Sequence, residues 1–231
     1  MPAQQSAPIE LHYWPTPNGQ KISIALEELG VPYTTHFVHI GKGEQFKPEF
    51  LKIAPNNRIP AIVDPEGPDG KPISIFESGA ILIYLAEKFG RFYGRNARER
   101  VAVNEWLMWQ MGGVGPMFGQ LNHFKNAAPE KLAYAIKRYA DETHRLYRVL
   151  NGRLEGRQYV ADDYSIADMS LLGWTRGWKN RDIDIGEFPN FAAWLERLEA
   201  RPAVQRGLAL KAPPAPEVSA AEQAKVLYGQ R

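Results

Sequence analysis

Between residues 9 and 89, short runs of alternating apolar and polar residues are separated by stretches with helical spacing. Alternation with a period of two predicts strands, whereas apolar residues at intervals of three and four predict the buried face of a helix. The predicted order is strand, helix, strand, helix, strand, strand, helix. Strands are expected at Ile9–Trp14, Tyr33–Ile40, Arg58–Val63 and Ile73–Phe76, and helices after Gly19, at Phe46–Leu51 and after Ser78.

Beyond a linker at Gly90–Asn96, apolar residues recur only at helical intervals, so this part of the chain is predicted to be all-helical. The pairs Gly112-Gly113 and Gly115-Pro116 fall inside the first of these helices and should kink or split it. Ser165 and Asp168 have the spacing of a capping box, which marks a helix start. The helices are expected at about 97–122, 129–154, 165–178 and 189–200.

The patterns predict the fold class α/β plus all-α, with two domains. The predicted boundaries are a loose arm at 1–8, the α/β domain at 9–89, the linker at 90–96, the helical domain at 97–210 and a tail at 211–231. Pro213-Pro214-Ala215-Pro216 favours an extended tail, because proline cannot continue a helix. A last helical turn is expected near Ala221–Leu227.

The chain has no cysteine among its 231 residues. This excludes a disulfide scaffold, a thiolate zinc site and a thiol nucleophile supplied by the protein. Any thiol chemistry must therefore use a thiol that a ligand brings in. The five histidines have no ligand-like spacing, so no metal is expected.

Charge and hydropathy indicate an ordinary globular protein. The formal net charge is +2, and basic residues are scattered among acidic ones, which argues against nucleic-acid binding. No apolar run approaches the length of a membrane span, and no charged-then-apolar leader opens the chain. We therefore expect a cytoplasmic protein with neither a nucleic-acid nor a membrane partner.

Two polar segments stand where predicted helices begin. Thr16-Pro17-Asn18 precedes the first helix, and the exposed N–H groups and partial positive charge of a helix N-terminus lower the pKa of a thiol placed there. Ser78 is the predicted N-cap of the third helix, with Glu77 just outside it, and such an N-terminus favours a carboxylate. The plain alternative is that Thr16 and Asn18 form only a turn and cap, and that Ser78 is only a cap.

Ile59-Pro60-Ala61, followed by Glu77-Ser78-Gly79-Ala80-Ile81 at the head of a helix, closely resembles the thioredoxin-like domain of glutathione transferases. The strings TPNGxK, GKGxQFxPEFLxIxPNNxIPAIVD and GPMxGQxxHF narrow the resemblance to the bacterial nu-class, with a more distant likeness to a fungal nitrogen-regulator protein. The resemblance covers about Leu11 to Pro202. It implies an N-terminal thioredoxin-like domain followed by an all-helical glutathione-transferase C-terminal domain.

The resemblance also implies where glutathione binds. In the family, the residue before a cis-proline pairs its backbone with the cysteinyl unit, and a Glu-Ser pair holds the γ-glutamyl end. The implied residues are Thr16 and Asn18 at the sulfur, Ile59 and Pro60 at the cysteinyl unit, Glu77 and Ser78 at the γ-glutamyl end, and Gln45 and Arg58 at the glycyl end or nearby carboxylates.

The helical domain contributes further candidates. Arg138 matches an arginine that reaches the site in the family, and it also fits a solvated helix charge. A polar and aromatic cluster is a candidate for the second-substrate side, and His123 is a general base by residue type, although packing explains it as well. Asp168 is interpreted as structural. The cluster consists of Gln120, Asn122, His123 and Phe124.

In the nu-class, activity toward organic disulfides is prominent and conjugating activity is low, and two glutathione molecules or the oxidised dimer occupy one site. The leading hypothesis is therefore glutathione-dependent reduction of small-molecule or peptide disulfides. Conjugation of glutathione to electrophiles and peroxide reduction use the same first site and stay open as alternatives. A non-catalytic interaction module is the alternative from another class. The resemblance also implies a homodimer.

Overall fold

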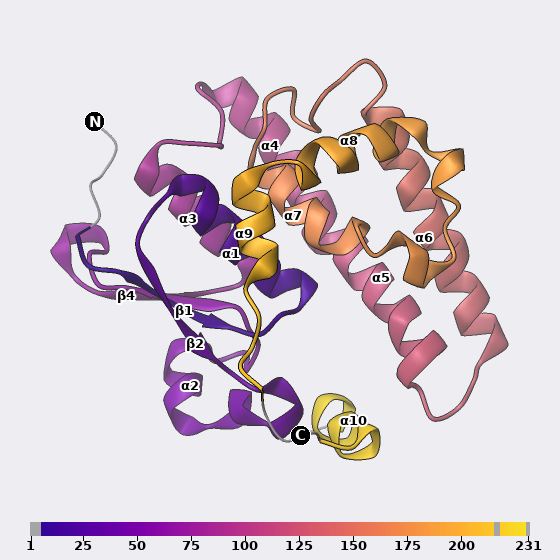
Figure 1. Ribbon diagram of the computed structural model, residues 1–231, viewed down its shortest axis with the longest axis horizontal. Coiled ribbons are helices and arrows are strands. Elements are labelled where there is room, and N and C mark those ends of the chain that lie inside the picture. The colour runs from indigo at the N-terminus through magenta and orange to yellow at the C-terminus, as the bar shows by residue number, and fades with distance from the viewer. Residues whose placement is uncertain (1–5, 215–217, 230–231) are drawn as a thin grey trace. The chain divides into compact units, whose positions relative to one another are not determined.

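The computed structural model describes residues 6–214 and 218–229 (Figure 1). These residues form two compact units. One contains the described residues up to Phe89 together with those from Gln205 onward, and the other spans Gly90–Val204. The chain therefore rejoins the first unit at Gln205, ahead of the predicted end of the helical domain at residue 210.

The first unit is built on a four-stranded sheet with the order β2-β1-β3-β4. The first strand pairs in parallel with the second and antiparallel with the third, which pairs antiparallel with the fourth. Leu11 lies opposite Ile62 in the centre of the sheet, and both side chains are fully buried. The strands are β1 (Ile9–Tyr13), β2 (Tyr33–Phe37), β3 (Ala61–Asp64) and β4 (Ile73–Phe76).

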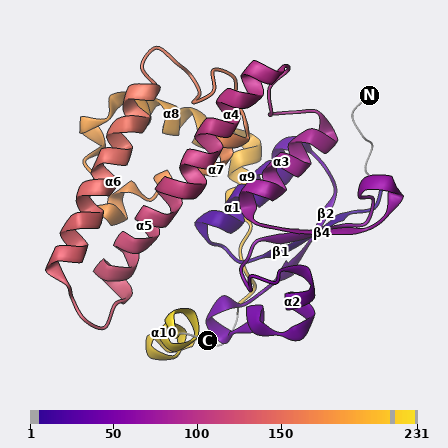
Figure 2. The ribbon, with the colours of Figure 1, turned by 180° about the vertical axis from the view of Figure 1, so that it is seen from behind.

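Helices cover both faces of this sheet. Figures 1 and 2 show α1 (Pro17–Leu29) and α3 (Ser78–Phe89) together on one face and α2 (Pro48–Ile53) on the other. Gly30 ends α1 in a left-handed conformation with a φ of 70°, as the glycine before Pro32 predicts. Two short turns, η1 (Ile40–Lys42) and η2 (Glu44–Phe46), connect β2 to α2. The arrangement confirms the predicted thioredoxin-like α/β domain.

Several predicted boundaries in this unit differ from the structure. The strands β1 and β2 end before the predicted Trp14 and Ile40, and α2 begins and ends two residues later than predicted. Two further differences lie at the candidate site. The third strand begins at Ala61 and not at Arg58, because Pro60 has no N–H to join the ladder. Ser78 is the first residue of α3 and not its N-cap. The N–H of Ile81 donates to the carbonyl of Glu77 at 2.9 Å, so Glu77 accepts the first bond of the helix and occupies the cap position.

The C-terminal segment packs on α1. A Cβ atom on Gly207 would lie 2.7 Å from the backbone of Ile24, so only glycine allows this close approach. The Ser23 hydroxyl donates to the Gly207 carbonyl at 2.8 Å, and Arg206 pairs with Glu27 at 2.6 Å. These contacts belong to a helix that local patterns do not predict, α9 (Pro202–Ala209).

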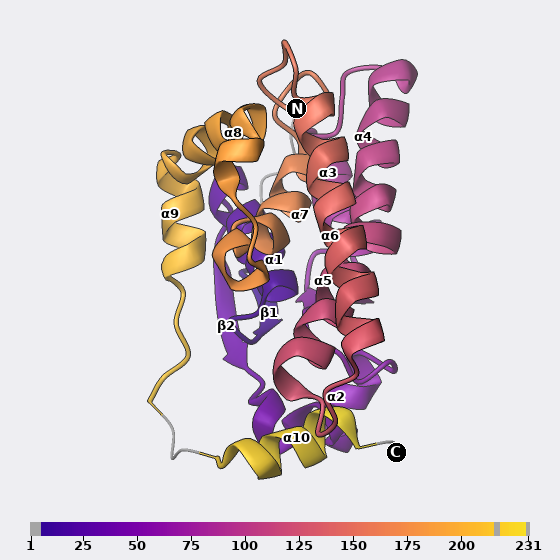
Figure 3. The same ribbon diagram turned by 90° about the vertical axis from the view of Figure 1, so that its right-hand side faces the viewer.

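The tail contains more than the predicted last helical turn. A helix, α10 (Ala220–Tyr228), packs against η1, and Gln223 lies beside Gly41 there (Figure 3). Ala215 and Pro216 of the predicted extended stretch, and residues 1–5 of the predicted arm, lie outside the described residues.

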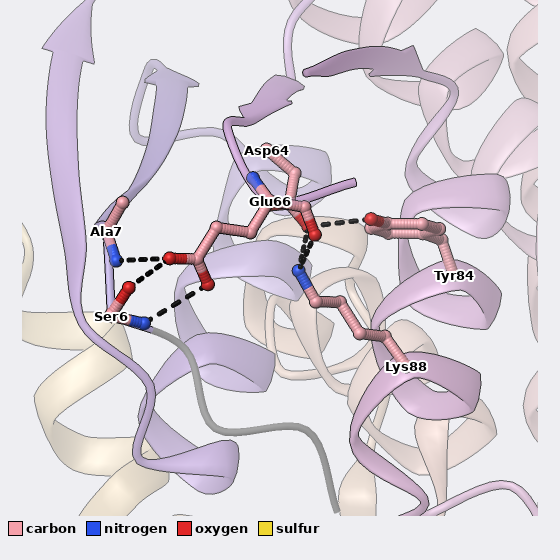
Figure 4. A network of polar contacts seen from close by, with 6 residues as sticks. All are labelled: Ser6, Ala7, Asp64, Glu66, Tyr84 and Lys88. Carbon is pink, nitrogen blue, oxygen red and sulfur yellow. Dashed lines mark hydrogen bonds and ion pairs between the residues drawn. The ribbon is translucent and has the colours of Figure 1, made fainter. Parts of the chain in front are cut away.

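A polar network joins the end of β3 to α3 and to the first described residues (Figure 4). Asp64 is fully buried, accepts a hydrogen bond from the Tyr84 hydroxyl at 2.6 Å and pairs with the Lys88 ammonium at 2.5 Å. Burial alone would raise the pKa of Asp64, but the bonds from Lys88 and Tyr84 lower it. Glu66 accepts bonds from the Ser6 hydroxyl and from the backbone N–H of Ala7, the latter at 3.0 Å.

Replacing Lys88 by methionine should lower the free energy of unfolding by about 3 kcal/mol, because the buried Asp64 carboxylate would lose its cation. Urea denaturation measures this change. Lys71→Met is the matched control, since Lys71 is exposed in the turn between β3 and β4. If the two variants unfold at the same urea concentration, the ion pair contributes nothing to stability.

The second unit consists of helices. A π-helical segment, η4, interrupts its first long helix and contains the predicted kink at Gly112-Gly113, and a second π-helical segment, η5, ends this helix. A Cβ atom on Gly115 would lie 2.8 Å from the Gln110 side chain, which explains the glycine at the exit from η4. The segments are α4 (Ala97–Trp109), η4 (Gln110–Val114), α5 (Gly115–Asn122), η5 (His123–Ala127), α6 (Ala133–Arg153), α7 (Ile166–Thr175) and α8 (Pro189–Glu199).

The predicted capping box begins α7. Ser165 is the N-cap, and the Asp168 carboxylate accepts a bond from the Ser165 N–H at 3.1 Å. The other carboxylate oxygen of Asp168 accepts from the Trp194 indole at 2.9 Å and from the Val160 N–H at 3.1 Å. Burial raises the pKa of Asp168 to about 6, against the effect of these bonds, which favour the carboxylate. Asp168 is therefore structural, as predicted.

Helix boundaries in this unit also differ from the prediction. The long helix begins at Ala133 and not near residue 129, and Leu132 is 43% exposed because it is the extended residue before the helix. The helix after Ser165 ends at Thr175 and not at Trp178. Across the described residues, no helix has the length and apolar character needed to cross a membrane.

Candidate functional site

Thr16 is the N-cap of α1. Its Oγ1 accepts a hydrogen bond from the Gly19 N–H at 3.1 Å, and the residue is half-buried. Within the described part of the chain, no group accepts the Thr16 hydroxyl proton. A hydroxyl held in this way can donate to an anion that sits at the N-terminus of the helix, where the partial positive charge is also greatest. The capping role and the sulfur-binding role are therefore compatible.

Gly19 allows the tight turn before α1. A Cβ atom at this position would lie 2.3 Å from the Trp14 carbonyl oxygen, and Gly19 is buried. The Trp14 carbonyl also accepts a bond from the Thr16 N–H at 2.7 Å. These contacts explain the glycine of the TPNGxK string and hold Thr16 in place. Asn18 follows in the first turn of α1 and is half-buried.

Neither aromatic residue before Thr16 supplies a hydroxyl at this helix N-terminus. Tyr13 is fully buried, and its hydroxyl donates to the Leu210 carbonyl at 3.2 Å. Burial raises the pKa of the Tyr13 phenol. The Trp14 ring lies 4.2 Å from the ring of His39. Thr16 therefore provides the hydroxyl at the head of α1.

The peptide bond between Ile59 and Pro60 is cis and immediately precedes β3. The Ile59 side chain is half-buried against a small core cluster that includes Val38 and Phe50. Within the described residues, the backbone N–H and C=O of Ile59 make no hydrogen bond. Both groups are thus available for the backbone pairing that the resemblance implies.

Ser78 is buried at the head of α3, and the Lys21 ammonium donates to its hydroxyl oxygen at 3.1 Å. Lys21 itself is completely buried. Burial lowers the pKa of Lys21 to about 7, while the negative charge of Glu77 raises it. Glu77 is exposed, has a φ of 67° and accepts a bond from the Asn56 amide at 3.2 Å. Through Lys21, the first helix reaches the Glu-Ser pair.

The two residues expected at the glycyl end differ in their surroundings. Gln45 is 5% exposed, and its amide nitrogen donates to the Ile40 carbonyl at 3.1 Å. Its side-chain oxygen is buried, and among the described residues nothing donates to it. Arg58 is exposed and contacts no charged partner in the described chain. Gln45 is therefore fixed by its own unit, whereas Arg58 extends into solvent.

The candidates of the helical unit lie on neighbouring elements of that unit. Phe124 stacks on Tyr139 of α6 at 5.5 Å and meets His123 at 5.2 Å. Arg138, next to Tyr139, is exposed. The side chains of Gln120 and Asn122 are exposed as well, and that of Asn122 accepts a bond from Asn126 at 3.0 Å. Their roles stay predictions.

Lys21 was not among the predicted site residues. It is the lysine of the TPNGxK string, five residues after Thr16, and it stands directly before the mostly apolar run Ile22–Leu26. A lysine on a buried helix face is rare without a partner, so its place beside this run is the signal that could have identified it.

The first unit contains two helix N-termini that can bind anions, those of α1 and α3. One carries a hydroxyl donor and the other carries a serine hydrogen-bonded to a buried lysine. Such ends bind anions, which suits a thiolate and a carboxylate. Among the described residues, no group of three or more His, Cys, Asp or Glu side chains is arranged to hold a metal ion.

Comparison with known proteins agrees with this arrangement. Residues 16–88 match the glutathione S-transferase N-terminal domain, and residues 108–202 match the C-terminal domain. The disulfide-bond oxidoreductase YfcG of Escherichia coli is 52% identical over 87% of this chain and 94% of its own.

Two solved structures are also similar. A glutathione transferase from Burkholderia graminis, with two glutathione molecules bound per subunit, is 47% identical with a TM-score of 0.84 and covers 90% of each chain. One from Pseudomonas putida, with one glutathione disulfide bound per subunit, is 42% identical with a TM-score of 0.85, over 90% of this chain and 94% of that one. On both family domains and on these identities, the chain belongs to the glutathione S-transferase family.

Proposed function

We propose that the protein reduces disulfides, with glutathione as the only source of thiols. The observation that carries the proposal is the head of α1, where Thr16 is a helix cap whose hydroxyl proton has no acceptor in the described residues. This place stabilises a thiolate, and the chain has no cysteine to supply one. The sulfur held there must therefore come from glutathione.

The reaction consists of two exchanges. The thiolate of bound glutathione attacks one sulfur of the substrate disulfide, a mixed disulfide forms, and the other substrate sulfur leaves as a thiolate that takes up a proton. The thiolate of a second glutathione then attacks the glutathione sulfur of the mixed disulfide. Oxidised glutathione and the second substrate thiol are released. Two glutathione molecules are oxidised for each disulfide reduced, and no protein sulfur takes part.

The relatives support this reading. The similar protein from E. coli is a disulfide-bond oxidoreductase, and the similar structures hold either two glutathione molecules or one glutathione disulfide per subunit. A site of that kind accommodates both partners of the second exchange. We propose the same occupancy here, with small-molecule or peptide disulfides as substrates.

Conjugation and peroxide reduction would use the same thiolate. The chain has threonine at the head of α1, and the hydroxyl of the nearest tyrosine, Tyr13, is engaged with the Leu210 carbonyl. The site thus lacks the tyrosine or serine that ordinary conjugating members of the family place beside the sulfur. This favours disulfide reduction over conjugation.

Asn18→Ala should lower kcat/KM for reduction of a small organic disulfide about tenfold, because an amide donor to a charged sulfur contributes more than a neutral hydrogen bond. The assay uses excess glutathione beside a parallel conjugation assay with a chlorinated aromatic. Rates are compared with the uncatalysed glutathione background.

Each outcome of that comparison assigns a function. Strong reductase activity with weak conjugation, reduced in the variant, supports the proposal. Strong conjugation with weak reduction would replace it by the transferase alternative. If glutathione binds and neither reaction exceeds the background, the protein is a non-catalytic module on this fold.

A further inference from the structure

The C-terminal helix α10 packs on the turn η1 of the same unit (Figure 3). Gly41 allows the approach, since a Cβ atom there would lie 3.2 Å from Cγ of Gln223. Val226 lies beside Gly43, with its Cγ1 atom 3.6 Å from the position that a Cβ atom of this glycine would occupy. Gln223 and Val226 are three positions apart, so they share one face of α10. We call this face the docking face of α10.

The helix adds little to the core of the unit. None of its described side chains is buried: Val226 and Leu227 are half-buried, and the others, including that of Tyr228, are exposed. The helix has nine residues, and isolated helices of fewer than about 12 residues are marginally stable in water. Docking on η1 therefore holds α10 in place, and the role of the helix is to be sought in the contacts that it makes there.

One of these contacts involves His39, the residue before η1. Atom Cε1 of its ring lies 3.3 Å from the position that a Cβ atom of Gly41 would occupy, so His39 and Gln223 flank the same point. The His39 ring also packs against the ring of Trp14, with the two centroids 4.2 Å apart and the planes inclined by 38°. The His39 ring thus connects α10 with Trp14.

Trp14 fixes the turn before α1. Its backbone carbonyl accepts a hydrogen bond from the Thr16 N–H at 2.7 Å, and a Cβ atom on Gly19 would lie 2.3 Å from the same oxygen. Because these contacts are tight, a small rotation of Trp14 also moves the Thr16 hydroxyl. A donor stabilises an anion only if it is already oriented toward it. The placement of Trp14 therefore affects the thiolate position.

We propose that His39 is a positioning residue of the thiolate site, and that α10 is a strap that holds the His39 ring against Trp14. The contacts run from α10 to His39, then to Trp14 and to the turn that carries Thr16. This inference rests on the proposed function, since it assumes that the glutathione sulfur lies at Thr16. The match to the family's C-terminal domain ends at residue 202, and α10 follows it. Full activity then depends on a segment outside both family domains.

His39→Ala removes the ring that packs against Trp14. It should lower kcat/KM for reduction of a small organic disulfide about tenfold at pH 7, because a displaced donor stabilises the thiolate less. The pKa of the bound glutathione thiol should rise toward about 8.5, so the loss should shrink as the pH approaches 9. His39→Phe keeps a ring of similar shape and should keep most of the activity, since Nδ1 of His39 is buried and no described group bonds to it.

The strap is tested from its own side of the contact. Val226→Asp places a charge against Gly43 and should undock α10, with a loss of activity close to that of His39→Ala. Lys225→Asp is the matched control, because Lys225 is exposed and lies off the docking face. This control should reduce disulfides as the wild type does. If α10 acts through His39, the double variant His39→Ala/Val226→Asp should be no less active than His39→Ala alone.

The ultraviolet absorbance of bound thiolate separates this inference from the proposed function, because it reports on the sulfur and needs no disulfide substrate. If the wild type holds glutathione as a thiolate but reduces no disulfide, the proposed function fails, while a higher thiol pKa in His39→Ala supports the inference. If the wild type holds no thiolate, both fail together.

Several results would overturn the inference alone. They are an unchanged thiol pKa in His39→Ala, a loss of activity that is the same at every pH, and equal losses in His39→Phe and His39→Ala. Additive losses in the double variant would show that α10 does not act through His39. Should His39→Ala not fold, equal activity and equal thiol pKa in Val226→Asp and Lys225→Asp would overturn the role of the strap.

Discussion

Replacing Asp168 by alanine should lower the free energy of unfolding by about 3–5 kcal/mol, because four buried donor groups would lose their acceptor. The donors are the indole of Trp194, the N–H groups of Val160 and Ser165, and the Ser165 hydroxyl, at 2.9, 3.1, 3.1 and 3.2 Å. Asp168 is fully buried, so water cannot replace the carboxylate. Urea denaturation followed by tryptophan fluorescence measures the loss.

Two further variants locate the cause. Asp168→Asn keeps the volume but turns an NH2 group toward donors, so it should also destabilise, by less than the alanine variant. Asp141→Ala removes an exposed pair with Lys137 on α6 and should cost less than about 1 kcal/mol. Equal losses in Asp141→Ala and Asp168→Ala would show that the buried bonds contribute little.

The capping box illustrates what local sequence predicts well. Ser165 and Asp168 satisfy each other's backbone within one turn, so the four-residue spacing is enough to locate the start of α7. The bonds from Trp194 and Val160 to the same carboxylate come from outside this turn, and no local pattern indicates them. The sequence therefore predicts the helix cap, but it does not predict the burial that makes the Asp168 carboxylate important for stability.

Ser78 shows the opposite case. A serine before an apolar helical run favours an N-cap, but its side chain is engaged by Lys21 from 57 residues earlier in the chain, and Glu77 occupies the cap position. Long-range packing of α1 against α3 decides the role of this serine. Local propensity cannot predict such a contact, because its two residues are far apart in the sequence.

The C-terminal segment shows what the spacing of residues along the chain does not predict. No separate helix was expected at Pro202–Ala209, and the spacing of its apolar residues does not say which unit buries it. The location depends on one close approach, Gly207 against the backbone of Ile24, which no period of apolar residues encodes. By contrast, the order of strands and helices along the α/β domain followed from the spacing of apolar residues and from the resemblance of the strings around Pro60.

Both candidate anion positions are built on helix ends that other elements hold rigidly. The turn before α1 is fixed by the close approach of Gly19 to the Trp14 carbonyl, and the head of α3 by the bond from Lys21. Rigid placement matters because a donor stabilises a developing or bound anion only if it is already oriented. The thiolate position should therefore respond most strongly to loss of its donor.

Replacing Thr16 by valine should lower kcat/KM for disulfide reduction about 100-fold at pH 7, the size of effect seen when a preorganised donor to an anion is removed. Valine has the shape of threonine but no hydroxyl. The change also removes the helix cap, where Oγ1 accepts from the Gly19 N–H at 3.1 Å, at a stability cost of about 1 kcal/mol. Loss of the cap alone is too small to account for the expected loss of activity.

The dependence on pH distinguishes thiolate stabilisation from general damage. Without the hydroxyl, the pKa of the bound glutathione thiol should rise toward its ordinary value of about 8.5, so less thiolate is present at pH 7. The deficit of Thr16→Val should then shrink as the pH approaches 9, and the ultraviolet absorbance of bound thiolate should appear at higher pH than in the wild type. Thr16→Ser retains both cap and donor and should keep most of the activity. A deficit that is the same at every pH, or shared by the serine variant, would contradict a role for Thr16 in holding the thiolate.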